Sequence, residues 1–156
     1  MKKPILLFFM VVMMLSCGSS KVERQTQKTF KGNWTLTNIE LPSALVDVSL
    51  FGDADTRCFE YSEWKFVPNN NKGTYQLFQE NCNPGTRSFH WNVEENTETG
   101  EFYFTLKQEV DGVNIRQEKR GVRLELVSLD ETQMQWKHTV SHEGKPFTIR
   151  MNFSKN

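Results

Sequence analysis

Apolar and polar residues alternate with a period of two along almost the whole chain that follows residue 30. The clearest example is the last segment, where Phe147, Ile149, Met151 and Phe153 are separated by single polar residues. Because successive side chains of a β-strand point to opposite faces, this pattern predicts a strand with one buried face. The same alternation marks further segments at residues 89–93, 102–106, 122–126 and 134–140.

Clusters of glycine, proline and asparagine separate these segments, as turns between strands require. They occur at residues 69–73, 83–85, 96–100, 111–112 and 143–146. No segment shows a sustained helical period. About eight short strands with one apolar face close most readily into an up-and-down barrel, which leaves no exposed edge. The sequence therefore predicts an all-β fold, an antiparallel up-and-down barrel of about eight strands.

Two stretches interrupt the pattern. Phe59 and Tyr61 have the opposite parity from Trp64 and Phe66. This predicts either a bulge between the two pairs or an outward-facing Phe59 and Tyr61. Residues 42–57 are compatible with a short strand, a helical turn or a lid, and the sequence leaves these three open.

The chain begins with Lys2 and Lys3, followed by an apolar run that ends at Leu15. This run is too short for a stable membrane-spanning helix and has the form of an export signal. The stretch Leu15-Ser16-Cys17-Gly18 resembles the lipobox of bacterial lipoproteins. The resemblance implies cleavage before Cys17 and acylation of that cysteine, which would anchor the domain to a membrane. An uncleaved signal anchor and an ordinary secretory signal are the alternatives.

On this interpretation the chain has three parts: a signal peptide (1–16), a lipidated N-terminus with a flexible tether (17–28) and a barrel domain (29–156). The signal peptide contains two of the 19 basic residues, so 17 basic and 19 acidic residues remain, a net charge of −2. A net charge so close to zero does not indicate the strongly basic surface that binds nucleic acid. We expect an exported monomer of the cell envelope, anchored to the outer membrane.

Two cysteines remain after cleavage, Cys58 and Cys82. An even pair in an exported chain is the setting in which disulfides form and persist, so we expect these two to be bridged. Closing a loop of this length would stabilise the fold by roughly 3 kcal/mol. The alternative is two separate thiols.

The start of the first predicted strand, Gly32-Asn33-Trp34, matches the Gly-x-Trp signature of lipocalins. Together with the barrel pattern and the two cysteines, the chain from residue 30 to residue 156 resembles the lipocalin-like lipoproteins of flavobacteria and their relatives. The resemblance implies that Gly32 lets the chain pass close under the barrel floor and that Trp34 plugs the closed end. It also implies a basic residue of the last strand against Trp34, for which Arg150 and Lys155 are the candidates.

The same resemblance implies a small hydrophobic ligand inside the barrel. Eight residues with inward parity are the candidates for lining it: Trp64, Phe66, Tyr75, Phe89, Trp91, Phe104, Trp136 and His138. His138 is either a hydrogen-bonded core histidine or a ligand-orienting group. A barrel of eight strands is either filled by side chains or just holds one small ligand. The sequence therefore leaves two functions open: a carrier of a small hydrophobic molecule, or a filled barrel whose loops 42–57 and 79–88 act on an unidentified protein partner.

The sequence shows no recognisable catalytic site. It has no nucleophile elbow, phosphate-binding glycine loop or dinucleotide fingerprint. On one strand His138 and His142 would be about 13 Å apart, too far to share a metal ion. The acidic residues near Cys58 are interpreted as a solvated loop: Asp53, Asp55 and Glu60. We expect no enzyme, no metal site and no cofactor.

Overall fold

A computed structural model describes residues 21–42, 48–115, 121–142 and 144–156. Cys17, with the lipobox and the signal peptide, lies outside these described residues, so the lipidation and the cleavage remain predictions. The described part of the chain includes no helix long and apolar enough to cross a membrane.

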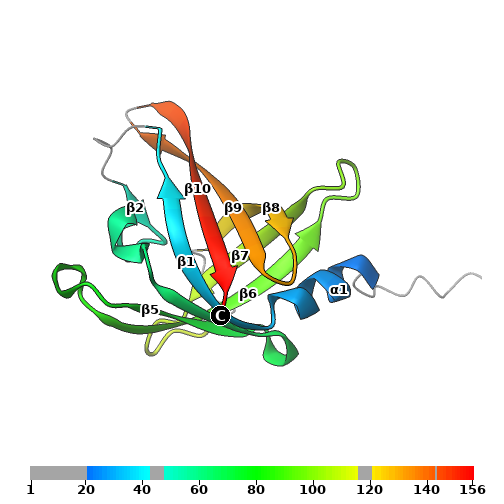
Figure 1. Ribbon diagram of the computed structural model, residues 1–156, viewed down its shortest axis with the longest axis horizontal. Helices are drawn as coiled ribbons and strands as arrows, with labels where there is room; N and C mark the ends of the chain where they lie inside the picture. The colour runs from blue at the N-terminus through cyan, green and yellow to red at the C-terminus, as the bar shows by residue number, and fades with distance from the viewer. Residues whose placement is uncertain (1–20, 43–47, 116–120, 143) are drawn as a thin grey trace, which may run out of the picture.

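Eight antiparallel strands form a closed barrel in the order β1-β10-β9-β8-β7-β6-β5-β4. Each strand pairs with its neighbours in the chain, and β1 closes the ring by pairing with both β10 and β4. Figure 1 shows these strands curling around a common axis. The strands are β1 (Gly32–Glu40), β4 (Glu63–Val67), β5 (Lys72–Leu77), β6 (Gly85–Glu95), β7 (Phe102–Gln108), β8 (Gly121–Leu129), β9 (Gln133–His142) and β10 (Lys145–Lys155). The predicted barrel is confirmed.

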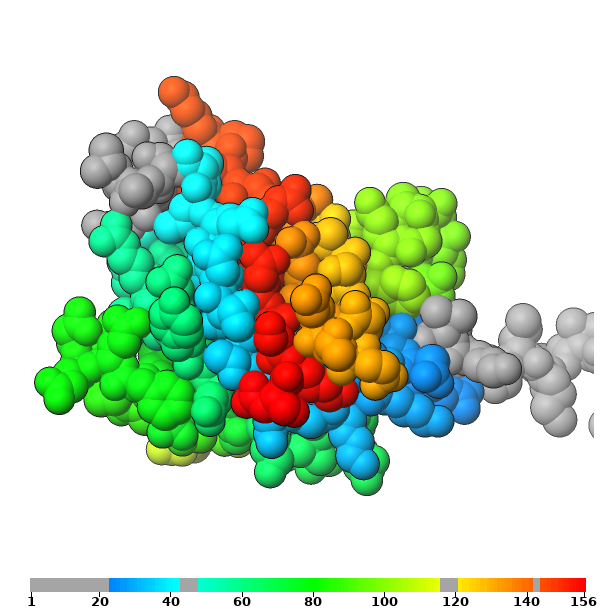
Figure 2. Space-filling model, in the orientation of Figure 1, coloured from blue at the N-terminus to red at the C-terminus, as the bar shows by residue number. Residues whose placement is uncertain are grey.

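The period of two decides which side chains face the interior. In β10, Ile149, Met151 and Phe153 are buried while the residues between them are partly exposed. The outer wall formed by β1, β10 and β9 is continuous in Figure 2, where these strands are cyan, red and orange. The apolar core therefore lies inside the barrel, and the polar residues of the strands cover its outside.

A helix, α1 (Lys21–Phe30), precedes the barrel and packs across the end at which β1 begins. The sequence predicts a flexible tether at residues 17–28, and for residues 21–28 the structure corrects this, because they form part of α1. The helix went unrecognised because it buries little apolar surface of its own: of its described side chains only Phe30 is fully buried. Packing of one face against the barrel stabilises this short and mostly polar helix.

The opposite end of the barrel is covered by residues 48–62, which we call the lid. It contains two short strands, β2 (Ser49–Leu50) and β3 (Ala54–Asp55), and a 3-10 helix, η1 (Thr56–Phe59). The sequence left the structure of residues 42–57 open, and residues 48–57 belong to the lid. Residues 43–47 lie outside the described residues. Further 3-10 turns are η2 (Pro68–Asn70) and η3 (Glu80–Cys82).

The lid also explains the parity change before Trp64. Strand β4 begins only at Glu63, but Tyr61 N donates to Leu36 O at 2.7 Å and Leu36 N donates to Ser62 O at 3.0 Å. Two residues before β4 thus lie opposite one residue of β1, as in the predicted bulge. Phe59 points into the core and is fully buried, whereas Tyr61 is 68% exposed, so the alternative of two outward-facing side chains holds for Tyr61 alone. The Cys58–Cys82 disulfide is confirmed and joins η1 to η3.

Candidate functional site

The sequence predicted eight residues that face the barrel interior, and the structure brings seven of them into one aromatic core. These seven are buried: Trp64, Phe66, Tyr75, Phe89, Trp91, Phe104 and Trp136. The eighth, His138, is half-buried and lies opposite Ile149 of β10. Two further rings with inward parity, Phe102 and Phe147, are only partly buried because they lie near the ends of the barrel.

Rings from well-separated strands meet inside this core. Trp64 of β4 contacts Trp136 of β9, with ring centroids 5.5 Å apart and planes at 88°. Trp136 in turn stacks on Phe104 of β7 at 4.5 Å. These are the offset and edge-to-face arrangements that aromatic pairs prefer. Side chains therefore fill this level of the barrel.

One buried polar atom in this core has no partner among the described residues. The indole nitrogens of Trp34, Trp64 and Trp91 donate to Phe30 O, Ser62 Oγ and Lys72 O, at 2.8, 2.8 and 2.9 Å. The Nε1 of Trp136 has no hydrogen-bond partner, although the residue is fully buried. An unsatisfied buried donor costs about 1–3 kcal/mol. An acceptor atom brought into the barrel would remove this cost.

Apolar side chains of the lid close the mouth of the barrel. Phe51 and Phe59 contact each other at 5.3 Å, and their rings lie 5.8 and 6.4 Å from that of Trp64. Leu50 is fully buried beside them. These residues belong to a segment outside the barrel strands, so the mouth is filled by a separate piece of chain.

The closed lid holds two residues in a strained backbone conformation. Phe51 has φ +57° and Tyr61 has φ +63°, and neither is a glycine. For L-residues the left-handed region costs roughly 1–2 kcal/mol, and bulky side chains there are uncommon. The two residues lie near the two ends of the lid.

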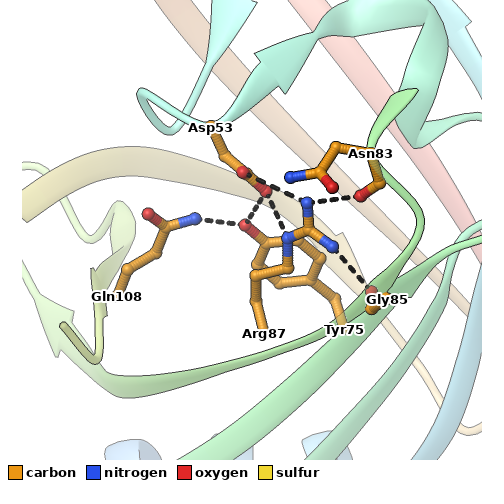
Figure 3. Close-up of polar contacts among 6 residues, drawn as sticks. All are labelled: Asp53, Tyr75, Asn83, Gly85, Arg87 and Gln108. Carbon is orange, nitrogen blue, oxygen red and sulfur yellow. Dashed lines mark hydrogen bonds and ion pairs between the residues drawn. The ribbon is translucent and has the colours of Figure 1, made fainter. Parts of the chain in front are cut away.

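A polar cluster fastens the lid to the barrel wall, as Figure 3 shows. Asp53 of the lid accepts hydrogen bonds through Oδ2 from Arg87 Nε at 2.9 Å and from the Tyr75 hydroxyl at 2.8 Å. Arg87 Nη2 lies 3.5 Å from Oδ1 of the same carboxylate. The side chains of Arg87 and Asp53 are each only 17% exposed. This ion pair is therefore partly shielded from water. Such shielding makes its electrostatic attraction stronger than that of an ion pair on an open surface.

The neighbours of this cluster fix the direction of its hydrogen bonds. Gln108 Nε2 donates to the Tyr75 hydroxyl oxygen, which leaves the phenolic proton for Asp53. The pKa of Tyr75 lies well above its ordinary value, mainly because the ring is buried and also because of the hydrogen bond and negative charge of Asp53. Tyr75 is therefore a permanent donor at physiological pH.

Of this cluster, only Tyr75 was among the residues that the sequence predicted at the barrel interior. The sequence analysis interpreted Asp53 as part of a solvated loop, which the ion pair with Arg87 corrects. Arg87 and Gln108 lie two positions from Phe89 and Leu106 on the same strands, so they share the inward parity of these buried residues. This parity could have identified them as inward-facing polar residues. Asp53 carried none, since the lid that brings it to the wall has no sequence period.

His138 belongs to the opposite wall of the barrel. Burial lowers the pKa of its imidazole below the ordinary value, and a hydrogen bond with the backbone of Arg123 partly opposes this shift. The neutral imidazole is therefore favoured at neutral pH. No group of three histidine, cysteine, aspartate or glutamate side chains in the described ranges could hold a metal ion.

The floor of the barrel is formed by the Gly-x-Trp motif. The ammonium group of Lys155 lies 5.0 Å from the ring centroid of Trp34, so Lys155, and not Arg150, is the basic residue of the last strand at this position. Gly32 has φ +125°, and a Cβ there would lie 3.2 Å from the Lys155 side chain. Phe30 stacks on Phe104 from below at 5.4 Å. The motif thus closes the end opposite the lid.

Comparison with known proteins gives a family and several structural similarities. The model of the lipocalin-like domain matches residues 30–136. No curated protein matches the sequence. The chain is similar to a solved lipocalin-like protein from Bacteroides uniformis, with 9% identity, a TM-score of 0.49 and coverage of 82% of this chain and 99% of that one. It is also similar to bovine odorant binding protein complexed with its natural ligand (12% identity, TM-score 0.43, coverage 82% and 72%) and to lobster apocrustacyanin A1 (11%, 0.44, 88% and 71%).

Proposed function

Because the chain belongs to the lipocalin-like domain family, whose eight-stranded barrels are of the size that holds one small hydrophobic ligand, we propose that this protein binds such a ligand in the mouth of its barrel. The lid moves aside on binding. The ligand then occupies the space that Leu50, Phe51 and Phe59 fill in the closed structure.

The main observation behind this proposal is that the side chains that fill the mouth come from the lid and not from the barrel strands. Strand residues pack the middle of the barrel, and they cannot leave without unfolding it. Phe51 and Phe59 come from the lid, whose backbone is strained at Phe51 and Tyr61 in the closed state. Displacing them exposes the faces of Trp64 and Tyr75, which are apolar surfaces suited to a small hydrophobic molecule.

The proposal includes the location of the protein. The export signal and the lipobox at Cys17 support a lipid-anchored protein of the cell envelope, attached to the outer membrane. The first described residue, Lys21, begins the helix that packs on the floor of the barrel. An anchor at Cys17 would therefore attach to the floor end and leave the lid facing away from the membrane. The protein acts without catalysis, as a binding or transport protein.

Native mass spectrometry of residues 18–156 tests this function with fatty acids, fatty alcohols and hydrophobic pigments. We expect one-to-one adducts that become more abundant in Phe51→Ala, because this substitution removes a ring from the mouth. Tyr61→Ala is the matched control: Tyr61 lies in the same lid with the same left-handed backbone, but its side chain is exposed. A bare protein mass for all three proteins across the whole panel would contradict the proposal.

A second candidate function rests on a different observation. Four of the exposed large apolar side chains lie in the loops at the lid end: Tyr61, Phe78, Val110 and Val113. Exposed apolar residues gathered at one end of a molecule are typical of protein interaction sites. A filled barrel that acts through these loops would show no adducts, whereas Tyr61→Ser and Phe78→Ser would weaken its association with an envelope protein and Val127→Ser, on the outer wall, would not.

A further inference from the structure

The carboxylate at the mouth of the barrel belongs to the lid, while every group that binds it belongs to the barrel wall. Asp53 supplies the two oxygens, and Arg87 and Tyr75 supply the donors from β6 and β5. Gln108 of β7 orients the Tyr75 hydroxyl. Three neighbouring strands thus present a carboxylate-binding cradle to whatever lies in the mouth (Figure 3).

Contacts that do not involve the lid hold this cradle in place. Arg87 Nη1 donates to Gly85 O at 2.9 Å, and Arg87 Nη2 donates to Asn83 O at 2.7 Å. Both carbonyls lie at the start of β6 or in the turn before it. These two contacts hold the guanidinium group in place independently of Asp53.

An open lid would leave Arg87 without its counter-ion. Arginine carries a positively charged guanidinium group, and the side chain of Arg87 is only 17% exposed. Leaving a largely buried charge unpaired is costly, whereas a bound carboxylate restores charge-assisted hydrogen bonds. The ligand that replaces the lid most favourably therefore carries an anionic group of the same geometry as Asp53.

The apolar part of such a ligand has a matching place beside the cradle. Phe51 lies two residues before Asp53, and its ring is 6.4 Å from that of Tyr75. The lid thus fills the mouth with an apolar group and a carboxylate side by side. On the β8, β9 and β10 side of the mouth, partly buried apolar residues face the interior: Val122, Val140 and Phe147.

We propose that the ligand is a hydrophobic monocarboxylate, such as a medium-chain fatty acid, whose carboxylate takes the place of Asp53 on Arg87 and Tyr75. This inference rests on the proposed function and adds the chemical class of the ligand. Asp53 is then an internal competitor: its carboxylate occupies the cradle while the barrel is empty and yields it to the ligand.

Isothermal titration calorimetry with dodecanoic acid and dodecan-1-ol tests the proposal, because the two molecules differ only in the polar head. We expect residues 18–156 to bind the acid more tightly than the alcohol. Asp53→Asn keeps the shape of the side chain but removes its charge, so the acid should bind about tenfold more tightly, as expected for one charge-assisted interaction. Arg87→Gln should abolish the preference for the acid. Arg123→Gln, which removes a cation stacked on Tyr103 on the outer face, should retain it.

The possible results distinguish a failure of the carboxylate proposal from a failure of the proposed ligand binding. Equal affinities for the acid and the alcohol in the parent protein would overturn the carboxylate proposal and leave ligand binding intact. An equal gain for both molecules in Asp53→Asn would also overturn it, because Asp53 would then act only as a fastening for the lid. Binding of neither molecule by any variant would overturn the carboxylate proposal, and the mass-spectrometry panel with hydrophobic pigments then decides whether the proposed function itself stands. If Asp53→Asn fails to fold, the comparison of Arg87→Gln with Arg123→Gln decides alone.

Discussion

At the scale of single residues, the floor motif acts as a cap for α1. Trp34 Nε1 donates to the carbonyl of Phe30 at 2.8 Å, and Lys155 Nζ donates to the carbonyl of Thr29 at 3.2 Å. Both carbonyls belong to the last turn of the helix, where backbone acceptors lack intrahelical partners. The positive charge of Lys155 also opposes the negative end of the helix dipole. The Gly-x-Trp motif and the last strand therefore join the helix to the barrel.

This capping role predicts that Lys155→Met lowers the free energy of unfolding by about 1 kcal/mol, through loss of the cation–π contact and of the helix cap. Urea unfolding followed by tryptophan fluorescence would measure the change. Lys145→Met is the control, because Lys145 lies on the same strand with an exposed side chain. Equal stability of the two variants would show that the contact with Trp34 is not stabilising.

His138 should make the stability of the protein depend on pH. Burial holds its pKa below the ordinary value of 6.5, so below that pH the unfolded chain binds a proton that the folded chain does not. The stabilisation is complete above about pH 6.5 and is lost as the pH falls toward the folded-state value. Urea midpoints measured between pH 5 and 8 should therefore fall less steeply on acidification in His138→Gln. An unchanged pH dependence would refute this role.

At the scale of elements, β5 approaches β4 and β6 closely at Gly73. A Cβ at this position would lie 2.4 Å from the Phe89 ring and 2.7 Å from the carbonyl oxygen of Lys65. The first contact would force a buried ring to move, and the second would push the backbones of paired strands apart. A glycine at Gly73 is thus required by packing rather than by backbone conformation.

We expect Gly73→Ala to lower the free energy of unfolding by about 1–3 kcal/mol, the usual cost of overpacking a well-filled core. Gly121→Ala provides the matched control: it is also a strand glycine, and its nearest neighbours at 3.3 Å are flexible atoms of the Lys107 side chain. Chemical denaturation of both variants measures the difference. A loss of stability in Gly121→Ala as large as in Gly73→Ala would contradict the packing argument.

At the scale of the whole molecule, the contacts that fasten the lid to the barrel include a covalent bond and an ion pair. The Cys58–Cys82 disulfide joins η1 to η3, which follows β5, and the Asp53 ion pair joins the lid to β6. The disulfide closes a loop between residues separated by 24 positions. If the lid opens as proposed, the disulfide limits how far it can move away, whereas the ion pair can break and form again.

Replacing both cysteines by serine should lower the free energy of unfolding by roughly 3 kcal/mol, because the unfolded chain loses a cross-link. Thermal and urea unfolding of the double variant Cys58→Ser/Cys82→Ser, compared with the oxidised parent protein, measures this. Adding a reductant should destabilise the parent protein and leave the double variant unchanged. A reductant effect of equal size on both proteins would exclude the disulfide as its source.

The barrel could be predicted from the sequence because its signal is local and repeated. Most of the barrel strands carry the period of two, and the turns carry glycine, proline and asparagine. The inward positions of residues such as Phe104 and Trp136 therefore follow from each segment by itself. The paired cysteines and the Gly-x-Trp motif added the disulfide and the floor. Parity also assigned His138 to the inner face, where the structure has it half-buried.

The lid, the helix and the carboxylate cradle were decided only by the tertiary structure. Residues 48–62 have no period of their own, and residues 21–30 form a helix of only 10 residues, few of them apolar, so both segments depend on the barrel ends that they cover. Asp53 and Arg87 are 34 positions apart, and nothing in the sequence links one acid of a loop to one arginine of a strand. Their pairing follows from barrel closure, which brings the start of β6 beneath the lid. Local alternation was therefore sufficient to specify the barrel wall, while the contents of its mouth depended on contacts between distant segments.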